Sequence, residues 1–195
     1  MVIAELDDVV IRRVVTPDQR AVWRAGFAGA YQTVFGGHPY FERWYPSEAE
    51  GVWQHLNNVP DNVVLLATRG ESQVVGFGIG IPLLGKPSVA ATLSGLVPLK
   101  HTFYLAELGV LEPYRARGIG RTLVRARLRH VDPTNYSHIV LRVPLNHEAS
   151  WEMYKAMGFD DMGVTMDVPA LRIDGKVTTD RRMFMAKVLS QVALD

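Results

Sequence analysis

Apolar residues along the chain fall into short runs separated by polar and turn-forming residues. Runs of this length, rich in Val, Ile, Leu and Phe, predict β-strands. Seven such runs occur, at residues 9–15, 62–68, 73–84, 102–111, 137–143, 162–168 and 182–188. Arg69-Gly70-Glu71-Ser72 predicts a hairpin between the second and third runs, and a loop containing Asp174-Gly175 is expected to join the last two.

The first two helices are predicted from their start and stop signals. In Thr16-Pro17-Asp18-Gln19, a capping threonine, a proline at the first helical position and a glutamine three residues after the cap predict a helix start. This helix is expected to run to about residue 35 and to stop at Gly36-Gly37. Ser47-Glu48-Ala49-Glu50 predicts a second capping box, which opens a helix ending near residue 58.

Two further helices are predicted in the second half of the chain. One covers residues 118–130, and the other covers 148–157 and ends at Gly158. The inner face of the first is expected to contain Ile119, Thr122, Leu123 and Ala126. Residues 85–100 show little periodicity and are expected to form a long loop.

The elements follow one another in the order β-α-α-β-β-β-α-β-α-β-β, and no linker or repeat interrupts them. This order predicts a single α/β (α+β) domain over residues 1–195, with a mixed, mostly antiparallel sheet of about seven strands flanked by helices. The chain has 195 residues, 48% hydrophobic and 21% charged, which is enough for a substantial core.

Charge and composition exclude several classes of protein. The net charge of +1 gives no general attraction to nucleic acid or to an anionic membrane, so neither is expected as a partner. No apolar run is long enough for a membrane span, and Glu5, Asp7 and Asp8 interrupt any secretory signal, so a cytoplasmic enzyme is expected. The chain has no cysteine, and no metal-ligand spacing occurs, so no metal is expected.

A basic, glycine-rich turn at residues 115–120 is the main chemical signal. It follows an apolar strand and opens directly into a helix, so several backbone N–H groups and the positive end of a helix dipole point at one place. Such a place binds anions, and a pyrophosphate is the expected occupant. Gly118 and Gly120 permit close approach of a ligand, and positive charge is added by Arg115, Arg117 and Arg121. Taken alone, the segment is also compatible with an ordinary strand-to-helix turn.

Two motifs together resemble one family. Arg115-x-x-Gly118-x-Gly120, after a strand ending in Val110-x-x-Pro113, is similar to the acyl-CoA-binding motif of the GCN5-related N-acetyltransferases. Residues 146–159 resemble that family's Asn…Ala/Ser…Tyr…Gly-Phe segment. The resemblance implies a sheet that splays beside the motif helix, with acetyl-CoA bound in the gap. A homodimer is also possible on this basis.

The resemblance further implies which residues contact acetyl-CoA. The pantetheine arm would pair with the backbone of Leu108, Gly109 and Val110, like an added strand. Gly109 is equally compatible with a simple packing role. The pyrophosphate would lie on the N–H groups of Ala116, Arg117, Gly118, Ile119, Gly120 and Arg121. The family asparagine lies seven residues before the tyrosine, which in this chain is His147, and Asn146 is one residue further away. Asn146 is taken as the contact, with His147 and a plain helix-capping role as alternatives.

Acyl transfer to an amine needs a base for the amine proton and a donor for the departing thiolate. Tyr154 stands four residues before Gly158-Phe159, where the resemblance implies a tyrosine general acid. A phenol with a pKa near ~10 is protonated at neutral pH and can donate. Glu107, a carboxylate in an apolar strand, is the candidate general base, because desolvation raises its pKa. A core tyrosine, an ion-paired glutamate and a water chain as the base are the respective alternatives.

Aromatic residues are concentrated between residues 31 and 53, where the two N-terminal helices are joined. Such a cluster favours an enclosed acceptor pocket, to which Tyr31, Phe35, Tyr40 and the acidic Glu42 are assigned. The alternative is a packing cluster that fixes a long connection.

The sequence therefore predicts an acetyl-CoA-dependent N-acetyltransferase that acts on a primary amine, with a small-molecule acceptor favoured over a protein. The absence of cysteine excludes a route through an acyl-cysteine. A non-catalytic acyl-CoA-binding module on the same fold is the first alternative. A DNA-binding helix formed by the arginine-rich segment is the weaker second one.

Overall fold

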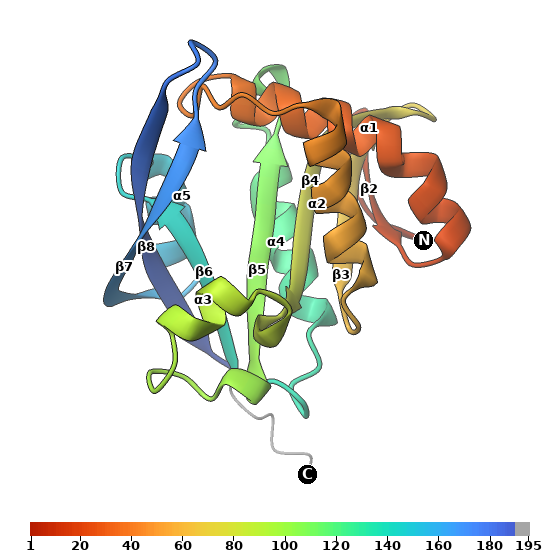
Figure 1. Ribbon diagram of the computed structural model, residues 1–195. Helices are drawn as coiled ribbons and strands as arrows, with labels where there is room; N and C mark the ends of the chain where they lie inside the picture. Colours follow the sequence, from red (N-terminus) through yellow and green to blue (C-terminus); the bar gives the residue numbers. More distant parts are fainter. Residues whose placement is uncertain (190–195) are drawn as a thin grey trace.

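The computed structural model describes residues 1–189, which form one sheet with helices on both faces (Figure 1). The eight strands stand in the order β1-β2-β3-β4-β5-β6-β8-β7. Their bounds are β1 Val2–Leu6, β2 Val9–Val14, β3 Val63–Arg69, β4 Gln73–Pro82, β5 Thr102–Val110, β6 His138–Pro144, β7 Asp160–Leu171 and β8 Val177–Val188. The α-helices are α1 Pro17–Gly36, α2 Pro46–Asn58, α3 Pro87–Thr92, α4 Ile119–His130 and α5 Glu148–Lys155. Three short 3₁₀ turns are η1 Leu83–Gly85, η2 Leu99–His101 and η3 Glu112–Tyr114.

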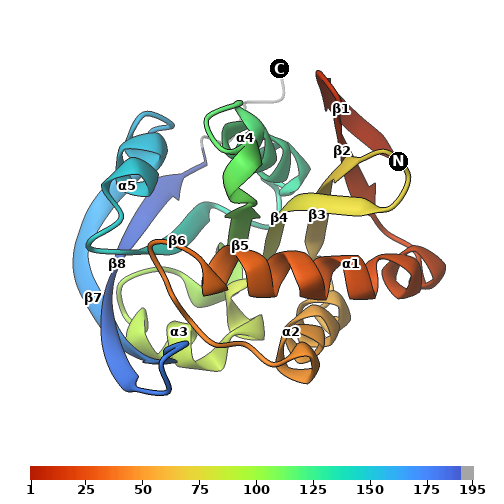
Figure 2. The same ribbon diagram turned by 90° about the horizontal axis from the view of Figure 1, so that it is seen from above.

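The sheet separates two cores. Seen from above, α1 and α2 cover one face and α4 and α5 cover the other (Figure 2). Fully buried aromatic side chains fill the first core, among them Phe27, Trp53 and Phe77. The second core includes the buried face of α4 together with Tyr154 and Phe159 from the α5 region. Side chains at alternate strand positions point into different cores, so each functional residue of the sheet faces one helix layer only.

Within residues 1–189 the strands β5 and β6 form the only parallel pair, and they separate soon after they meet. Their pairing covers Thr102–His138, Phe103–Ile139 and Tyr104–Val140, and it ends there within the described residues. All other neighbouring strands are antiparallel. A bulge follows in β5, because between the pairs Ile81–Tyr104 and Ile79–Glu107 two residues of β5 oppose a single residue of β4. The predicted mixed sheet and its splayed gap are thus confirmed.

Local helix signals were largely reliable. Thr16 caps α1 and forms the expected box with Gln19, and the helix stops at Gly36 before Gly37. The second box was placed two residues too late. Tyr45 is the N-cap of α2, Pro46 opens the helix, and the Glu48 carboxylate accepts the Tyr45 N–H at 2.8 Å. Proline at the first helical position explains the earlier start.

Three other predictions need correction. Residues 2–6 form an eighth strand, which pairs with β2 through a turn containing Asp7 in a left-handed conformation. The interval 85–100 contains the short helix α3, which opens at Pro87. The predicted loop at 169–181 is mostly hairpin, because β7 and β8 continue to Leu171 and from Val177. Polar residues alternate along this arm, which hides the strand signal. Residues 190–195 of the predicted domain lie outside the described part.

No helix within residues 1–189 is both long enough and apolar enough to span a membrane.

Candidate active site

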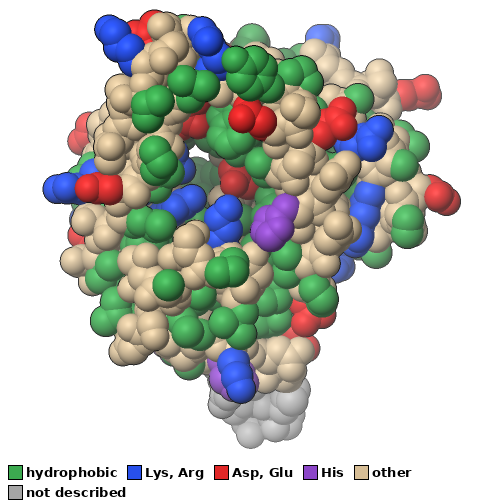
Figure 3. Space-filling view, viewed as in Figure 1, with side chains coloured by type: hydrophobic (Ala, Val, Ile, Leu, Met, Phe, Trp, Pro, Cys, Tyr) green, Lys and Arg blue, Asp and Glu red, His purple; other side chains and the backbone are tan. Residues whose placement is uncertain are grey.

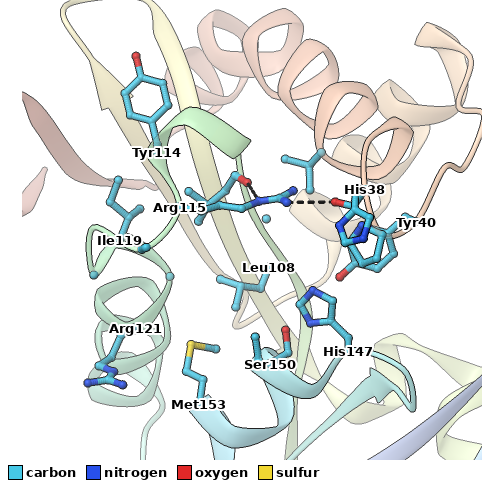
Figure 4. A pocket seen from close by; sticks show the side chains of 18 residues that line it. His38, Tyr40, Leu108, Tyr114, Arg115, Ile119, Arg121, His147, Ser150 and Met153 are labelled. Atoms are coloured by element: carbon cyan, nitrogen blue, oxygen red, sulfur yellow. Dashed lines mark hydrogen bonds between the residues drawn. The ribbon is translucent and has the colours of Figure 1, made fainter.

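The gap between β5 and β6 opens into a cavity of about 630 Å³. Its walls come from the end of β5, the glycine-rich turn, α4, α5 and the connection after α1 (Figure 4). The lining residues are Val34, His38, Pro39, Tyr40, Leu108, Gly109, Val110, Tyr114, Arg115, Ala116, Gly118, Ile119, Gly120, Arg121, His147, Ala149, Ser150 and Met153. A cavity of this size and mixed lining is typical of a small-molecule or cosubstrate site.

The glycine-rich turn has the backbone geometry of an anion site. Ala116 and Gly118 both adopt left-handed conformations, with φ of +60° and +80°. Gly118 is the N-cap of α4, so the unpaired N–H groups of the first helical turn lie beside it. Alternating conformations of this kind gather N–H groups into a concave cradle, and the helix dipole adds to the positive potential.

Arg115 fixes the wall of the cavity. Its Nε donates to the Val110 carbonyl at 3.1 Å, and its Nη1 donates to the His38 carbonyl at 3.0 Å (Figure 4). These two bonds join the end of β5 to the connection after α1. Arg115 therefore contributes positive charge and also positions two segments that are distant in sequence.

The opposite wall is formed by the start of α5 and by Tyr40. The rings of His147 and Tyr40 stack with centroids 5.7 Å apart. Burial, with Arg115 and His38, lowers the pKa of His147, so the imidazole is neutral at neutral pH. Its Nδ1 is buried without a hydrogen-bond partner in the described structure and is therefore available to a ligand. Burial raises the pKa of Tyr40 to about 12.

The structure brings together every predicted acetyl-CoA contact except Arg117 and Asn146. Arg117 forms ion pairs with Asp7 and Asp8 in the turn between β1 and β2, outside the cavity lining. Asn146 is exposed and also lies outside the lining, whereas its alternative, His147, lies within it. The one-residue offset in the motif is thus matched by a histidine at the cavity wall.

Gly109 has a packing role. A Cβ at this position would lie 2.3 Å from the Phe77 ring on the α1 face. Gly109 also lines the cavity, so this residue both packs against Phe77 and faces the proposed ligand.

Glu107 lies on the α1 side of the gap, partly buried. The bulge in β5 turns its side chain toward α1, where Tyr31 donates its hydroxyl to Glu107 Oε2 at the long distance of 3.5 Å. Burial raises the pKa of the Glu107 carboxyl, while Arg142, Lys86 and Arg182 act in the opposite direction. A carboxylate with a raised pKa beside an opening can accept a proton.

Tyr154 is buried on the α4 side and lies just behind the cavity wall. Burial raises its pKa, and the Arg127 guanidinium opposes that effect. Tyr154 in turn adds to the rise in the pKa of the Tyr40 phenol that burial causes. Tyr154 stays protonated at neutral pH, which suits a proton donor.

Arg127 is the principal residue that the sequence analysis missed. It is fully buried on α4, and its Nη1 donates to the carbonyls of Glu107 at 3.0 Å and Ile79 at 3.2 Å. Its Nη2 is buried with no hydrogen-bond partner in the described structure. Arg127 follows Leu123 by one helical turn, so the helical period could have placed it on the inner face of α4, but the predicted inner face did not include it.

The four predicted acceptor residues divide between the cavity and the core. Tyr40 lines the cavity, whereas Tyr31, Phe35 and Glu42 are buried in the α1 core. Glu42 accepts from Trp44 Nε1 at 2.9 Å and from Arg182 Nη2 at 3.2 Å. The aromatic rings of Tyr31 and Phe35 pack against each other in a tilted arrangement, with their centroids 4.6 Å apart. The cluster therefore packs the core and also supports the wall that faces Glu107.

The fold and site define an acyltransferase-like cleft, and sequence comparison agrees. The model of the acetyltransferase (GNAT) family matches residues 29–159, so this chain belongs to that family, as predicted. None of the curated proteins matches the chain significantly in sequence.

Solved structures share the fold at low identity. Ribosomal-protein-alanine N-acetyltransferase from Brucella melitensis is 22% identical, with a TM-score of 0.66 over 92% of this chain and 99% of its own. YncA from Salmonella typhimurium, a putative acetyltransferase with its cofactor acetyl-CoA, is 14% identical, with a TM-score of 0.63 over 96% of this chain and 97% of its own. Arabidopsis thaliana NAA60 in complex with a bisubstrate analogue is 17% identical, with a TM-score of 0.62 over 93% of this chain and 99% of its own.

Proposed function

We propose that this protein transfers an acetyl group from acetyl-CoA to the primary amine of a small molecule. The observation that carries the proposal is the joining of an anion cradle, a splayed strand edge and a partly buried carboxylate at one gap in the sheet. The cavity of about 630 Å³, with Arg115 and Arg121 in its lining, suits the phosphates and the pantetheine arm of acetyl-CoA.

Each candidate residue has a separate task in this reaction. Acetyl-CoA, when bound, supplies the thioester carbonyl that the amine attacks. The N–H groups around Gly118 hold phosphate, and the free edge of β5 orients the pantetheine arm. Glu107 accepts the proton of the amine from the α1 side of the gap. Tyr154, on the α4 side, donates a proton to the departing thiolate.

A small acceptor is favoured by a roof over the α1 side of the gap. The connection between α1 and α2 is hydrogen-bonded to the turn of the β7–β8 hairpin, as Arg43 N–H donates to the Leu171 carbonyl at 2.7 Å and Ile173 N–H to the Phe41 carbonyl at 2.9 Å. A β-bridge between Glu42 and Arg172 continues this contact. The two segments lie side by side in Figures 1 and 2. A polypeptide would have to thread beneath the roof, whereas a small amine would not.

The proposal is tested first by calorimetric titration with acetyl-CoA. Wild-type protein is expected to bind with micromolar affinity, and Gly118→Asp should weaken binding by about tenfold or more, because it adds a carboxylate at the phosphate cradle. Gly95→Asp is the matched control, since Gly95 has the same φ of +80° and no atom within 4 Å of an added Cβ. It should bind like the wild type.

Thiol release with a panel of amines then separates an enzyme from a binding module. Transfer to any amine supports the proposal. Micromolar binding without transfer to any amine would identify a non-catalytic acyl-CoA-binding protein. No binding by the wild type would exclude both the acetyltransferase and the acyl-CoA-binding module.

A further inference from the structure

Cations lie near Glu107 on the α1 side of the gap and in the roof above it, and some of them already have partners. Arg182 contacts Glu42 at 3.2 Å, and Arg172 forms an ion pair with Asp180. Both pairs are largely buried and belong to the roof and wall of the opening. Since their charges cancel locally, neither pair is free to hold a charged ligand.

Two further cations, Lys86 and Arg142, have no carboxylate partner within residues 1–189. Both side chains are partly buried. The Arg142 guanidinium contacts the uncharged Met166 sulfur, with Nη1 at 3.4 Å. Burying a guanidinium without a counter-ion costs free energy, so an anionic ligand that pairs with Arg142 would be stabilised there.

The splay of the sheet places Arg142 across the gap from Glu107. Val140 is the last β6 residue paired with β5, and Arg142 is two residues further along the same strand. Alternate residues share a face, so Arg142 faces the same core as Val140, the α1 core. Glu107 faces that core too, as its contact with Tyr31 shows. The carboxylate and the unpaired guanidinium thus stand on opposite walls of one opening.

Lys86 approaches the same opening from the start of α3, where it is the N-cap. Arg142, Lys86 and Arg182 each lower the pKa of Glu107 against the effect of burial, so all three lie close enough to influence its carboxyl. Figure 3 shows the surface hollowed between the β7–β8 hairpin and β5, with acidic and basic side chains around and inside the opening.

A simple alkylamine could pair only with Glu107, on one wall of this opening. It would leave Lys86 and Arg142 unpaired and would enter as a cation among cations. A ligand that also carries a carboxylate would satisfy both walls, because the planar guanidinium fork matches a carboxylate in a bidentate way.

We propose that the acceptor is a small amino acid-like molecule, whose amine lies at Glu107 and whose carboxylate is bound by Arg142 with Lys86 as the second cation. This inference rests on the proposed function, because it identifies the acceptor class of the same site. It makes Arg142 a specificity-determining residue of the reaction.

The test measures binding of matched ligands to the protein saturated with CoA, in which no transfer takes place. Alanine, 2-aminobutanoate and norleucine are compared by calorimetry with their decarboxylated forms, ethylamine, propylamine and pentylamine. The corresponding amino acid amides form a third set and mimic the N-terminus of a polypeptide. At least one amino acid should bind about tenfold or more tightly than its amine and its amide.

Substitutions then locate the carboxylate. Arg142→Gln should reduce the advantage of the amino acid over its amine by about tenfold, whereas Arg129→Gln, an exposed arginine on α4, should leave that ratio unchanged. Circular dichroism and thermal unfolding check that both variants are folded.

The outcomes separate this inference from the proposed function. No carboxylate advantage across the panel, tighter binding of the amides, or an unchanged ratio in Arg142→Gln would each overturn the acceptor class. If the amino acid binds through Arg142 but acetyl-CoA gives no thiol release with it, the acceptor class holds for the site and the proposed transfer fails.

Discussion

At the scale of single residues, the two proposed proton carriers, Glu107 and Tyr154, lie on opposite sides of the sheet, and Arg127 lies between them. Its side chain bonds the Glu107 carbonyl and lies beside the Tyr154 hydroxyl. The guanidinium charge offsets part of the rise in the pKa of Tyr154 that burial causes. A buried cation therefore stabilises the negative charge that develops when Tyr154 gives up its proton.

Replacing Tyr154 by Phe is expected to lower kcat by about 100-fold, because general acid catalysis of this kind contributes on that order. Acetyl-CoA affinity should be nearly unchanged, since its proposed contacts come from the glycine-rich turn and the end of β5 and not from the hydroxyl. Steady-state kinetics and calorimetry measure the two effects. Tyr136→Phe removes a phenol that bonds Asp61 instead, and it should not change kcat. Unchanged turnover in Tyr154→Phe would show that Tyr154 is not the acid.

Glu107→Gln is expected to lower kcat/KM by about 100-fold and to remove the acidic limb of its pH profile. The reason is that the base must be ionised, and activity falls as the pH drops through the raised pKa of Glu107. An acidic limb that persists in the variant would assign the base to another group.

The same variant should be more stable than the wild type at neutral pH. A carboxyl whose pKa is raised on folding binds more protons in the folded state, so it destabilises the protein as the pH rises through that window. Gln resembles the protonated form of Glu107. The gain in stability of the variant should therefore vanish below about pH 4, where Glu107 is protonated in the unfolded state as well. Thermal unfolding at both pH values measures this, and a gain that persists in acid would contradict the assigned cause.

At the scale of elements, β4 and β5 fit together through a glycine opposite an aromatic ring. Gly109 is paired with Phe77, and a Cβ there would overlap that buried ring. Gly109→Ala should destabilise the protein by about 1–3 kcal/mol through overpacking, as measured by chemical denaturation. Adding Phe77→Leu should recover part of the loss, whereas simple additivity of the two changes would exclude the overlap. Gly29→Ala, with open space around it, is the control and should not destabilise.

The elements that could be predicted from sequence were those with strong local signals. Thr16 and Gln19 defined the start of α1, and Arg69-Gly70-Glu71-Ser72 defined a hairpin. The strand β1 and the outer part of the β7–β8 arm were missed, because their partly exposed residues alternate without a continuous apolar run. Helix α3 is only six residues long and was hidden in an apparent loop.

The sequence predicted the half of the candidate site that the glycine-rich turn forms, because its glycines and arginines are adjacent in sequence. The proposed acceptor half could not be predicted, because it brings together residues as distant in sequence as Glu42, Lys86, Arg142 and Arg182. The side of the sheet to which Glu107 points also depends on the bulge in β5, and no local pattern predicts a bulge at that position.

At the scale of the whole molecule, the sheet acts as a partition with one break, at β5 and β6. The donor cavity lies toward α4 and α5, and the proposed acceptor opening lies toward α1 and the β7–β8 arm. The two substrates would thus approach the break from opposite faces. Such an arrangement favours direct transfer in a ternary complex, and without cysteine no acyl-cysteine intermediate can form.

The connection between α1 and α2 belongs to both compartments. Its residues His38 and Tyr40 line the donor cavity, while Phe41 and Glu42 are tied to the hairpin over the acceptor opening. If one ligand orders this connection, less conformational entropy of the connection remains to be lost when the other ligand binds. Affinities for donor and acceptor are then thermodynamically linked, and each raises the other by the same factor. A segment of a few residues would thereby give the enzyme positive cooperativity between unlike substrates within a single chain.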